Sequence, residues 1–208
     1  MDFWLTHTRQ DISACTALEL GSRNGRLSLW LALQGARVIC TDVDQLREGA
    51  IEEHQVRGVS NLIEYESVDA TCIPYQNHFD IVVFKSMLGA VGGISGKVAQ
   101  SNAIMEMHKA LKKGGELFFA ENLIASPLHQ TLRKKFVRWG VGWRYVSVEE
   151  MAEFLSPFSK VQYRTLGFAG AFGRQEIQRK ALGILDQAIF NRISPERWRY
   201  IIVGVATK

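Results

Sequence analysis

Short apolar runs that alternate with helix-like stretches are the feature of this sequence that most restricts its fold. Each of the first five runs is bounded by turn residues and followed by a polar or helix-periodic stretch. Strands that alternate with helices form mainly parallel sheets that are covered on both faces. We therefore expect one α/β domain, a doubly wound and mostly parallel sheet of seven strands with helices on both faces. The expected strands are residues 14–20, 36–41, 62–66, 79–84, 116–120, 160–166 and 199–206.

The residues between these runs carry the signals of helices. An apolar stripe that starts at Leu27 ends at Gly35, and glycine commonly terminates helices. Ser147 and Glu150 have the spacing of a capping box, in which both side chains satisfy N–H groups at a helix start. Apolar side chains recur at helical spacing within residues 174–193, so the chain is predicted to finish as strand, helix, strand.

The composition is that of an ordinary folded domain. Of the 208 residues, 47% are apolar and 22% are charged. No window approaches the roughly 20 uninterrupted apolar residues of a membrane span, and the first residues lack the layout of a secretory signal. We therefore expect a cytoplasmic protein. Cys15, Cys40 and Cys72 are widely separated in apolar runs, which indicates buried thiols rather than disulfides or a metal site.

The most informative segment is residues 18–25, which read Leu-Glu-Leu-Gly-Ser-Arg-Asn-Gly. A strand that carries Glu19 turns here through Gly21 and Gly25 and enters a helix. Gly21 can adopt backbone angles that are closed to other residues, and Gly25 lets the chain pass close to a ligand. The N–H groups at the start of the following helix suit a carboxylate or a phosphate. The segment therefore predicts a site for a nucleotide-like ligand.

Two further acids follow the next two strands. Asp42 ends the second strand, a position from which a carboxylate can accept both hydroxyls of a ribose. Asp69 follows the third strand, where a carboxylate can accept a hydrogen bond from an adenine amino group. Because the carboxyl ends of parallel strands meet at one edge of the sheet, Glu19, Asp42 and Asp69 are expected to form one constellation.

These motifs resemble those of the class I S-adenosylmethionine-dependent methyltransferases, whose first motif is an acid followed by a GxGxG-like loop. The resemblance implies a Rossmann-like fold, S-adenosylmethionine as the cofactor and methyl transfer as the activity. Arg23 replaces the middle glycine of the loop, and only the two outer glycines are expected to be required by this turn. The resemblance covers residues 14–121 and the closing strand, and is carried by residues 18–25, 41–44, 69–70, 79–84 and 111–119.

Carried over position by position, the resemblance implies a role for each residue of the cofactor site. The methionine carboxylate and amino group would lie near Glu19 and the loop backbone. Asp42 would bind the ribose hydroxyls, and Val43 would pack on the adenine. Asp69 and the N–H of Ala70 would bind the adenine edge, while the backbone after the fourth strand would border the sulfonium and the acceptor. The implied cofactor-binding residues are Glu19, Gly21, Ser22, Arg23, Asn24, Gly25, Asp42, Val43, Asp69, Ala70, Lys85 and Ser86.

Other chemistries fit less well. A nicotinamide-dependent dehydrogenase has the same order of elements, but its GxGxxG loop requires glycine where this chain has Arg23 and Arg26. The sequence has no GxxxxGK[ST] phosphate loop, no GxSxG nucleophile elbow and no HExxH helix. The five histidines have no ligand spacing, so no metal is expected.

The methyl acceptor is less constrained than the cofactor. In this fold, acceptor specificity usually comes from the N-terminal arm and from insertions after the fourth and fifth strands. If the acceptor is a hydroxyl, a general base becomes useful, and His7 and His129 are the histidines nearest the expected pocket. The turn after the fourth strand lacks the Asn/Asp-Pro-Pro-aromatic run that holds a base amine, which argues against amino-methylation of DNA.

Residues 128–145 mix five cations with four aromatic side chains. This stretch fits a solvated helix face with its aromatics packed on the sheet, a lid over an anionic small molecule, a peripheral membrane contact, or an RNA contact. The net charge of +4 is compatible with an anionic small molecule, a membrane surface or RNA as the partner. We expect an anionic small-molecule acceptor, with an anionic or lipid-linked glycan as a candidate, partly because residues 193–206 resemble the tail of methyltransferases found with surface-polysaccharide genes.

Two alternatives stay open: an RNA methyltransferase, and a methyltransferase-like subunit without catalytic activity. The sequence does not define the oligomeric state. We expect one methyltransferase domain over residues 1–208. Its parts are an N-terminal arm (1–13), the cofactor-binding core (14–121), a basic and aromatic lid or cap (122–147) and a C-terminal part of the sheet with an extra helix (148–208).

Overall fold

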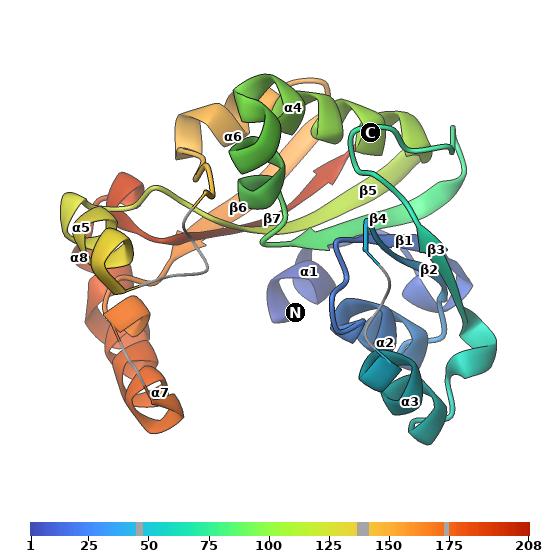
Figure 1. The fold of residues 1–208 in the computed structure, drawn as a ribbon, viewed down its shortest axis with the longest axis horizontal. Coiled ribbons are helices and arrows are strands. Elements are labelled where there is room, and N and C mark those ends of the chain that lie inside the picture. The colour runs from blue at the N-terminus through green and yellow to red at the C-terminus, as the bar shows by residue number, and fades with distance from the viewer. Residues whose placement is uncertain (45–47, 137–141, 173–174) are drawn as a thin grey trace.

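A seven-stranded sheet runs through the computed structural model, which describes residues 1–44, 48–136, 142–172 and 175–208 (Figure 1). The strand order is β3-β2-β1-β4-β5-β7-β6. Strands β1 to β5 pair in parallel, whereas β7 is antiparallel to both of its neighbours, β5 and β6. The strands are β1 (Thr16–Leu20), β2 (Arg37–Asp42), β3 (Ile63–Ser67), β4 (Phe79–Lys85), β5 (Leu111–Asn122), β6 (Lys160–Leu166) and β7 (Ile201–Thr207). The predicted doubly wound sheet is confirmed, with every expected run on its strand.

Helices cover both faces of the sheet (Figure 1). In this view α4 and α6 lie above the sheet, α1, α2 and α3 lie below it, and α5, α7 and α8 gather at one end. The helices are α1 (Asp2–His7), α2 (Arg26–Leu33), α3 (Glu48–Val56), α4 (Leu88–Ala110), α5 (Pro127–Phe136), α6 (Val148–Phe154), α7 (Glu176–Leu185) and α8 (Asn191–Ile193). No helix within these described ranges is long and apolar enough to cross a membrane.

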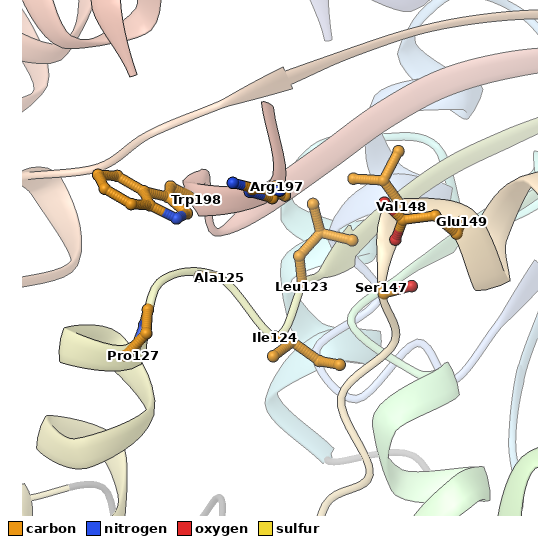
Figure 2. Close-up of a pocket in the computed structure, with 9 residues that line it drawn as sticks. All are labelled: Leu123, Ile124, Ala125, Pro127, Ser147, Val148, Glu149, Arg197 and Trp198. Atoms are coloured by element: carbon orange, nitrogen blue, oxygen red, sulfur yellow. The ribbon is translucent and has the colours of Figure 1, made fainter. Parts of the chain in front are cut away.

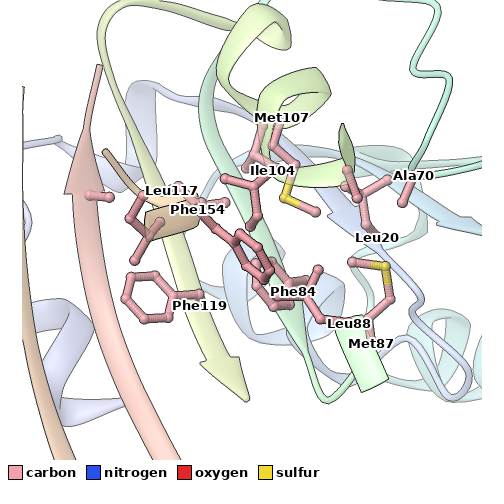
Figure 3. Packing of buried hydrophobic residues seen from close by; sticks show 14 of the residues in the cluster. Leu20, Ala70, Phe84, Met87, Leu88, Ile104, Met107, Leu117, Phe119 and Phe154 are labelled. Atoms are coloured by element: carbon pink, nitrogen blue, oxygen red, sulfur yellow. The ribbon is translucent and has the colours of Figure 1, made fainter. Parts of the chain in front are cut away.

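The larger core lies between the sheet and the two helices α4 and α6 (Figure 3). Phe84 of β4 and Phe119 of β5 pack there against Ile104 and Met107 of α4, and all four side chains are fully buried. Burying a side chain of this size stabilises the fold by about 1.5–3 kcal/mol. This packing fixes α4, and therefore also the turn that leads into it from β4.

The opposite face of the sheet has its own core, which includes the N-terminal arm. Trp4 of α1 stacks on Phe118 at a ring-centroid distance of 5.8 Å, and its Nε1 donates to the carbonyl of Gly204 at 3.1 Å. After α1, the Thr8 hydroxyl donates to the carboxylate of Glu116 at 2.5 Å. Glu116 pairs with Ile81 near the start of β4, so the arm reaches the edge where the parallel strands begin.

Two local predictions are confirmed and one is wrong. The capping box between Ser147 and Glu150 is formed in full at the start of α6. Residues 176–193 are helical, with a π-helical turn η5 (Asp186–Phe190) between α7 and α8, whereas position 174 lies outside the described residues. Cys15 and Cys40 are buried as expected, but Cys72 is exposed because it follows β3 in a loop rather than lying in a strand.

Candidate active site

The glycine loop follows β1 at the carboxyl edge of the sheet, the edge where the parallel strands end. Three of its residues have left-handed backbone angles, with φ of 65° at Gly21, 49° at Arg23 and 59° at Gly25. A residue with a side chain pays roughly 1–2 kcal/mol in this conformation, whereas glycine does not. Arg23 nevertheless adopts the third left-handed position with a side chain, which agrees with the expectation that the turn requires only its two outer glycines.

Both outer glycines also lie against side chains from distant elements. A Cβ atom on Gly21 would stand 2.8 Å from Cγ of Met87, and one on Gly25 would stand 2.6 Å from Cε1 of His54. His54 is buried, with its Nε2 at 2.9 Å from the Gly25 carbonyl and its Nδ1 at 2.8 Å from the Tyr65 hydroxyl. Sequence reasoning missed His54 because its partners lie on other elements and no local motif marks it.

Glu19 lies beneath the loop rather than in the open. Its side chain is buried, and one carboxylate oxygen accepts the N–H of Ser28 at 2.7 Å and the Ser28 hydroxyl at 2.5 Å. Burial raises the pKa of this carboxyl to about 7, although the hydrogen bonds from Ser28 act in the opposite direction. In this geometry Glu19 supports the loop by tying β1 to the first turn of α2.

Asp42, at the end of β2, lies beside the glycine loop as predicted from the strand order. One of its carboxylate oxygens accepts the N–H of Arg23 at 2.8 Å, and the other accepts the N–H of Val43 at 2.9 Å. These bonds fix the direction of the carboxylate, and each oxygen can accept a further donor. The next side chain, Val43, is 63% exposed and is therefore accessible to a ligand at this edge of the sheet.

Asp69 is held close to the same edge. The N–H of Val68 donates to the Asp42 carbonyl at 3.2 Å, which joins the ends of the second and third strands. One oxygen of the Asp69 carboxylate accepts the N–H and the hydroxyl of Thr71, both at 2.8 Å. Ala70 is buried in the core beneath. The second oxygen of Asp69 has no hydrogen bond within the described ranges and is available to a donor.

The Ser22 hydroxyl completes the polar character of the loop. It is buried, and among the residues that the structure describes it has no hydrogen-bond partner apart from the weakly bonding Cys40 thiol. An unpaired buried hydroxyl costs roughly 1–3 kcal/mol. This atom therefore fits a polar group of a ligand. Asn24, two residues further, is exposed on the loop.

The turn after β4 lies next to the glycine loop. Lys85 ends the strand with an exposed side chain, and Ser86 has a left-handed backbone with φ of 53°. The N–H of Ser86 donates to the Ala120 carbonyl at 2.8 Å. The following residue, Met87, is the one that contacts Gly21. Strained backbone at such a turn is typical of functional sites.

Glu121 holds this turn in place and was not identified from the sequence. It lies near the end of β5, it is 1% exposed, and one carboxylate oxygen accepts the N–H groups of Met87 at 2.9 Å and Leu88 at 2.8 Å. The other oxygen accepts the N–H of Asn122. Burial raises the pKa of Glu121 to about 7 against the effect of these bonds. The sequence signal, an acid at the end of an apolar strand, is the same as for Glu19.

The structure does not support His7 as a base. Its Nδ1 lies 2.8 Å from the Phe3 carbonyl and 2.9 Å from the Thr6 hydroxyl, and its ring stacks on Phe3. The adjacent residue Thr8 binds Glu116, at the edge where the parallel strands begin. The expectation that His7 borders the pocket is wrong because the arm runs to the edge opposite the glycine loop.

His129 is also a packing residue. It is 1% exposed, its Nδ1 lies 2.7 Å from the Ser126 hydroxyl, and its Nε2 lies 2.8 Å from the Phe168 carbonyl. The ring stacks on Phe172, and burial lowers its pKa. Both nitrogens are engaged, so neither is left to accept a proton from a substrate. The expected catalytic role is therefore not supported by the geometry.

A pocket of about 270 Å³ lies beyond the end of β5 (Figure 2). It is formed by the loop after β5, the start of α6 and the segment before β7, and Arg197 and Trp198 lie side by side over it. None of the implied cofactor residues lines it. The lining residues are Leu123, Ile124, Ala125, Pro127, Ser147, Val148, Glu149, Arg197 and Trp198.

Comparison with known proteins decides the class. Residues 18–119, from β1 to β5, match the family model described as "Methyltransferase domain". This chain carries a methyltransferase domain. The resemblance to the class I S-adenosylmethionine-dependent methyltransferases is thereby confirmed, and the matched methyltransferase domain contains the glycine loop, Asp42 and Asp69. No curated protein matches the sequence.

Solved structures of methyltransferases share the fold. An S-adenosylmethionine-dependent methyltransferase of Thermotoga maritima is 17% identical, with a TM-score of 0.65, and the match covers 100% of this chain and 86% of that one. Phosphoethanolamine N-methyltransferase 2 of Haemonchus contortus, solved in complex with S-adenosyl-L-methionine, is 14% identical with a TM-score of 0.64. That match covers 93% of this methyltransferase and 48% of the longer one.

Proposed function

We propose that this methyltransferase binds S-adenosylmethionine along the carboxyl edge of β1, β2 and β3 and methylates an anionic small molecule. The observation that carries the proposal is the convergence of the glycine loop and Asp42. The carboxylate of Asp42 accepts the N–H of Arg23 at 2.8 Å, so the loop and the acid form one surface. Asp69 joins this surface through the bond between Val68 and the Asp42 carbonyl.

The residues on this surface fit the parts of the cofactor. The buried Ser22 hydroxyl, which has only the weakly bonding Cys40 thiol beside it, and the loop N–H groups suit the methionine end. Asp42 suits the ribose hydroxyls, the exposed Val43 suits one face of the adenine, and the second oxygen of Asp69 suits its amino group. In this assignment Glu19 acts through Ser28 on the loop rather than by direct contact.

When bound, S-adenosylmethionine supplies an electrophilic methyl group. The chain contributes alignment, because a displacement at a methyl group needs the nucleophile and the leaving group in line. Met87 and the glycine loop are packed together, and Glu121 fixes the turn that carries Met87. His7 lies near the edge where the parallel strands begin, and both ring nitrogens of His129 are engaged. The geometry therefore favours acceptors that are already nucleophilic at neutral pH, such as amines or ionised oxygens.

The anionic acceptor is supported by the charges around the end of β5. Arg133 and Arg197 belong to the two segments that follow β5 and precede β7. A lipid-linked glycan is one acceptor with this chemistry. The fold relative from Haemonchus contortus is named for methylating phosphoethanolamine, a phosphate-bearing small molecule. RNA methylation and a non-catalytic role remain the competing outcomes of the tests.

Calorimetric titration of the purified protein with S-adenosylmethionine, S-adenosylhomocysteine and NADH tests the proposal. We expect both adenosyl ligands to bind and NADH to give no heat. Asp42→Ala is expected to weaken cofactor binding by about 1.5–3 kcal/mol, the range for a hydrogen bond to a charged group. Glu52→Gln, an exposed change on α3, is the matched control and is expected to bind as the wild type does.

Three results would contradict parts of the proposal. No binding of either adenosyl ligand would favour a non-catalytic subunit. Unchanged affinity in a folded Asp42→Ala variant would refute the ribose assignment. If the cofactor binds but methyl groups from a radiolabelled donor go only to added RNA and not to anionic glycans or phosphorylated amines, the small-molecule acceptor is wrong.

A further inference from the structure

Arg133 is a half-buried cation whose position is set by the loop after β5. It lies on α5, and its Nη1 donates to the carbonyl of Leu123 at 2.6 Å and to that of Ile124 at 3.3 Å. These bonds use one of the three guanidinium nitrogens. Burial lowers the pKa of Arg133, although guanidinium groups stay charged in proteins. The charge is therefore held in place and only partly solvated.

No carboxylate neutralises this charge within the described part of the chain. Arg133 forms no ion pair there, and residues 134–146, which include the segment outside the described residues, contain neither Asp nor Glu. A partly buried charge is costly unless it is paired. The ion pairs that the structure does show use Lys97, Lys109, Lys112, Arg144 and Lys180.

Tyr145 adds a neutral donor beside the guanidinium. The Arg133 guanidinium carbon lies 4.2 Å from the centroid of the Tyr145 ring, a cation–π contact that fixes both side chains. The Tyr145 hydroxyl has no hydrogen-bond partner among the described residues, and burial raises the pKa of Tyr145 so that it stays protonated. The backbone on both sides is anchored, because Arg144 donates to the Gly89 carbonyl and Val146 accepts from Ile124.

The pair lies next to the turn that borders the proposed methyl centre. Tyr145 is close enough to Glu121 for that carboxylate to raise its pKa, and Glu121 holds the N–H groups of Met87 and Leu88. The titratable groups that interact with Arg133 include Tyr145, Tyr200 and the buried His129. The pair therefore lies near the end of β5 that carries Glu121, and Arg133 itself forms no ion pair with a carboxylate among the described residues.

We infer that Arg133 and Tyr145 together bind the anionic group, a carboxylate or a phosphate, of the methyl acceptor. This inference rests on the proposed function for the identity of the acceptor, whereas the anion site itself can be tested alone. A guanidinium can bind either oxyanion in a bidentate way, and the phenol supplies a further hydrogen bond.

Inorganic phosphate and acetate are suitable probes, because they separate the two oxyanion classes. Each would be titrated into the full-length protein while the Arg133 Nε–H signal is followed by NMR, with the signal assigned by its loss in Arg133→Gln. We expect a saturable shift with at least one of the two anions, and a 3- to 10-fold weaker response in Tyr145→Phe. Arg164→Gln, which removes an exposed arginine from β6, is the control and is expected to leave the titration unchanged.

Two outcomes would overturn the inference: no saturable shift of the Arg133 signal with either anion, or equal shifts in the wild type and Tyr145→Phe. Cofactor binding by Arg133→Gln, measured by calorimetry on the same samples, is expected to stay within 2-fold of the wild type. A failure of cofactor binding in the wild type would refute the proposed function but leave the anion titration interpretable, so the two failures are distinguishable.

Discussion

The carboxylate of Glu19 accepts both the N–H and the hydroxyl of a single residue, Ser28, at 2.7 and 2.5 Å. Both residues are buried, with 3% and 0% of their surface exposed. Ser28 lies in the first turn of α2, directly after the glycine loop. These two hydrogen bonds therefore join β1 to α2, the strand and the helix on either side of the glycine loop.

Glu19→Gln is expected to change how stability depends on pH. Burial raises the folded-state pKa of Glu19 to about 7 from an ordinary value of 4.5, so the folded protein holds this proton more tightly than the unfolded chain. The proton at Glu19 thus favours the folded state fully at acid pH, and that contribution is lost as the pH rises through 7. Between about pH 5 and pH 8, the free energy of unfolding of the wild type should fall by up to a few kcal/mol relative to that of Glu19→Gln. Urea unfolding of both proteins across this pH range measures the two free energies of unfolding. If these change with pH in the same way in both proteins, the prediction is wrong.

Arg23→Gly is expected to stabilise the protein. Arg23 has a φ of 49°, a conformation in which a side chain costs roughly 1–2 kcal/mol, while glycine loses more entropy on folding, so we expect a net gain of up to about 1 kcal/mol. The N–H that donates to Asp42 is retained, so cofactor affinity should stay within a few-fold. Arg23→Ala is the matched control, because it removes the same side chain but still requires the left-handed backbone. Equal stability of the two variants in chemical unfolding would contradict the strain at this position.

Gly25→Ala is expected to destabilise the protein by about 2–4 kcal/mol, from the left-handed backbone and from a clash with a packed ring. The new Cβ would lie 2.6 Å from Cε1 of His54, whose two nitrogens are engaged by Gly25 and Tyr65. Gly49→Ala on α3 provides the opposite case, because a Cβ there meets nothing within 4 Å. It is expected to stabilise the helix by roughly 0.5–1 kcal/mol. In thermal unfolding, the Tm should therefore be lower than that of the wild type for Gly25→Ala and higher for Gly49→Ala.

The fold was predictable because its strands are short, apolar and bounded by turns. The position of Asp42 beside the glycine loop followed from the strand order, and Asp69 lies close to the same edge through the bond from Val68 to the Asp42 carbonyl. Backbone angles were less predictable. Arg23 has a left-handed backbone, which arginine disfavours, so the residue type at position 23 does not predict the backbone angle found there.

Side-chain networks between distant elements were the part that the sequence could not reveal. His54, Glu121 and Arg133 each bind backbone groups on another element or loop, and their neighbours in sequence give no sign of those partners. The geometry does not support His129 as a base for the same reason. His129 follows β5 as expected, but the ring turns into an aromatic cluster with Phe168 and Phe172 instead of toward the site.

The protonation of Glu121 should be visible at the backbone groups that it holds. Its carboxylate accepts the N–H groups of Met87, Leu88 and Asn122, and burial raises its pKa to about 7. An ionised carboxylate is a stronger acceptor than a protonated one. The amide signals of these three residues are therefore expected to titrate together in NMR spectra, with an apparent pKa near 7.

Glu121→Gln and Glu19→Gln separate this titration from other events. The first variant removes the ionisable group but keeps an oxygen that can accept the N–H groups of Met87 and Leu88, so the amide titration should disappear while the fold persists. The second variant removes the other buried carboxyl and should leave the titration unchanged. If the Met87 and Leu88 signals still titrate in Glu121→Gln, another group controls the turn, and Glu121 does not position it. If they titrate only in proteins that retain Glu121, this buried carboxyl links the end of β5 to the turn beside the glycine loop, and methyl transfer should rise through the same pH range as the carboxylate forms.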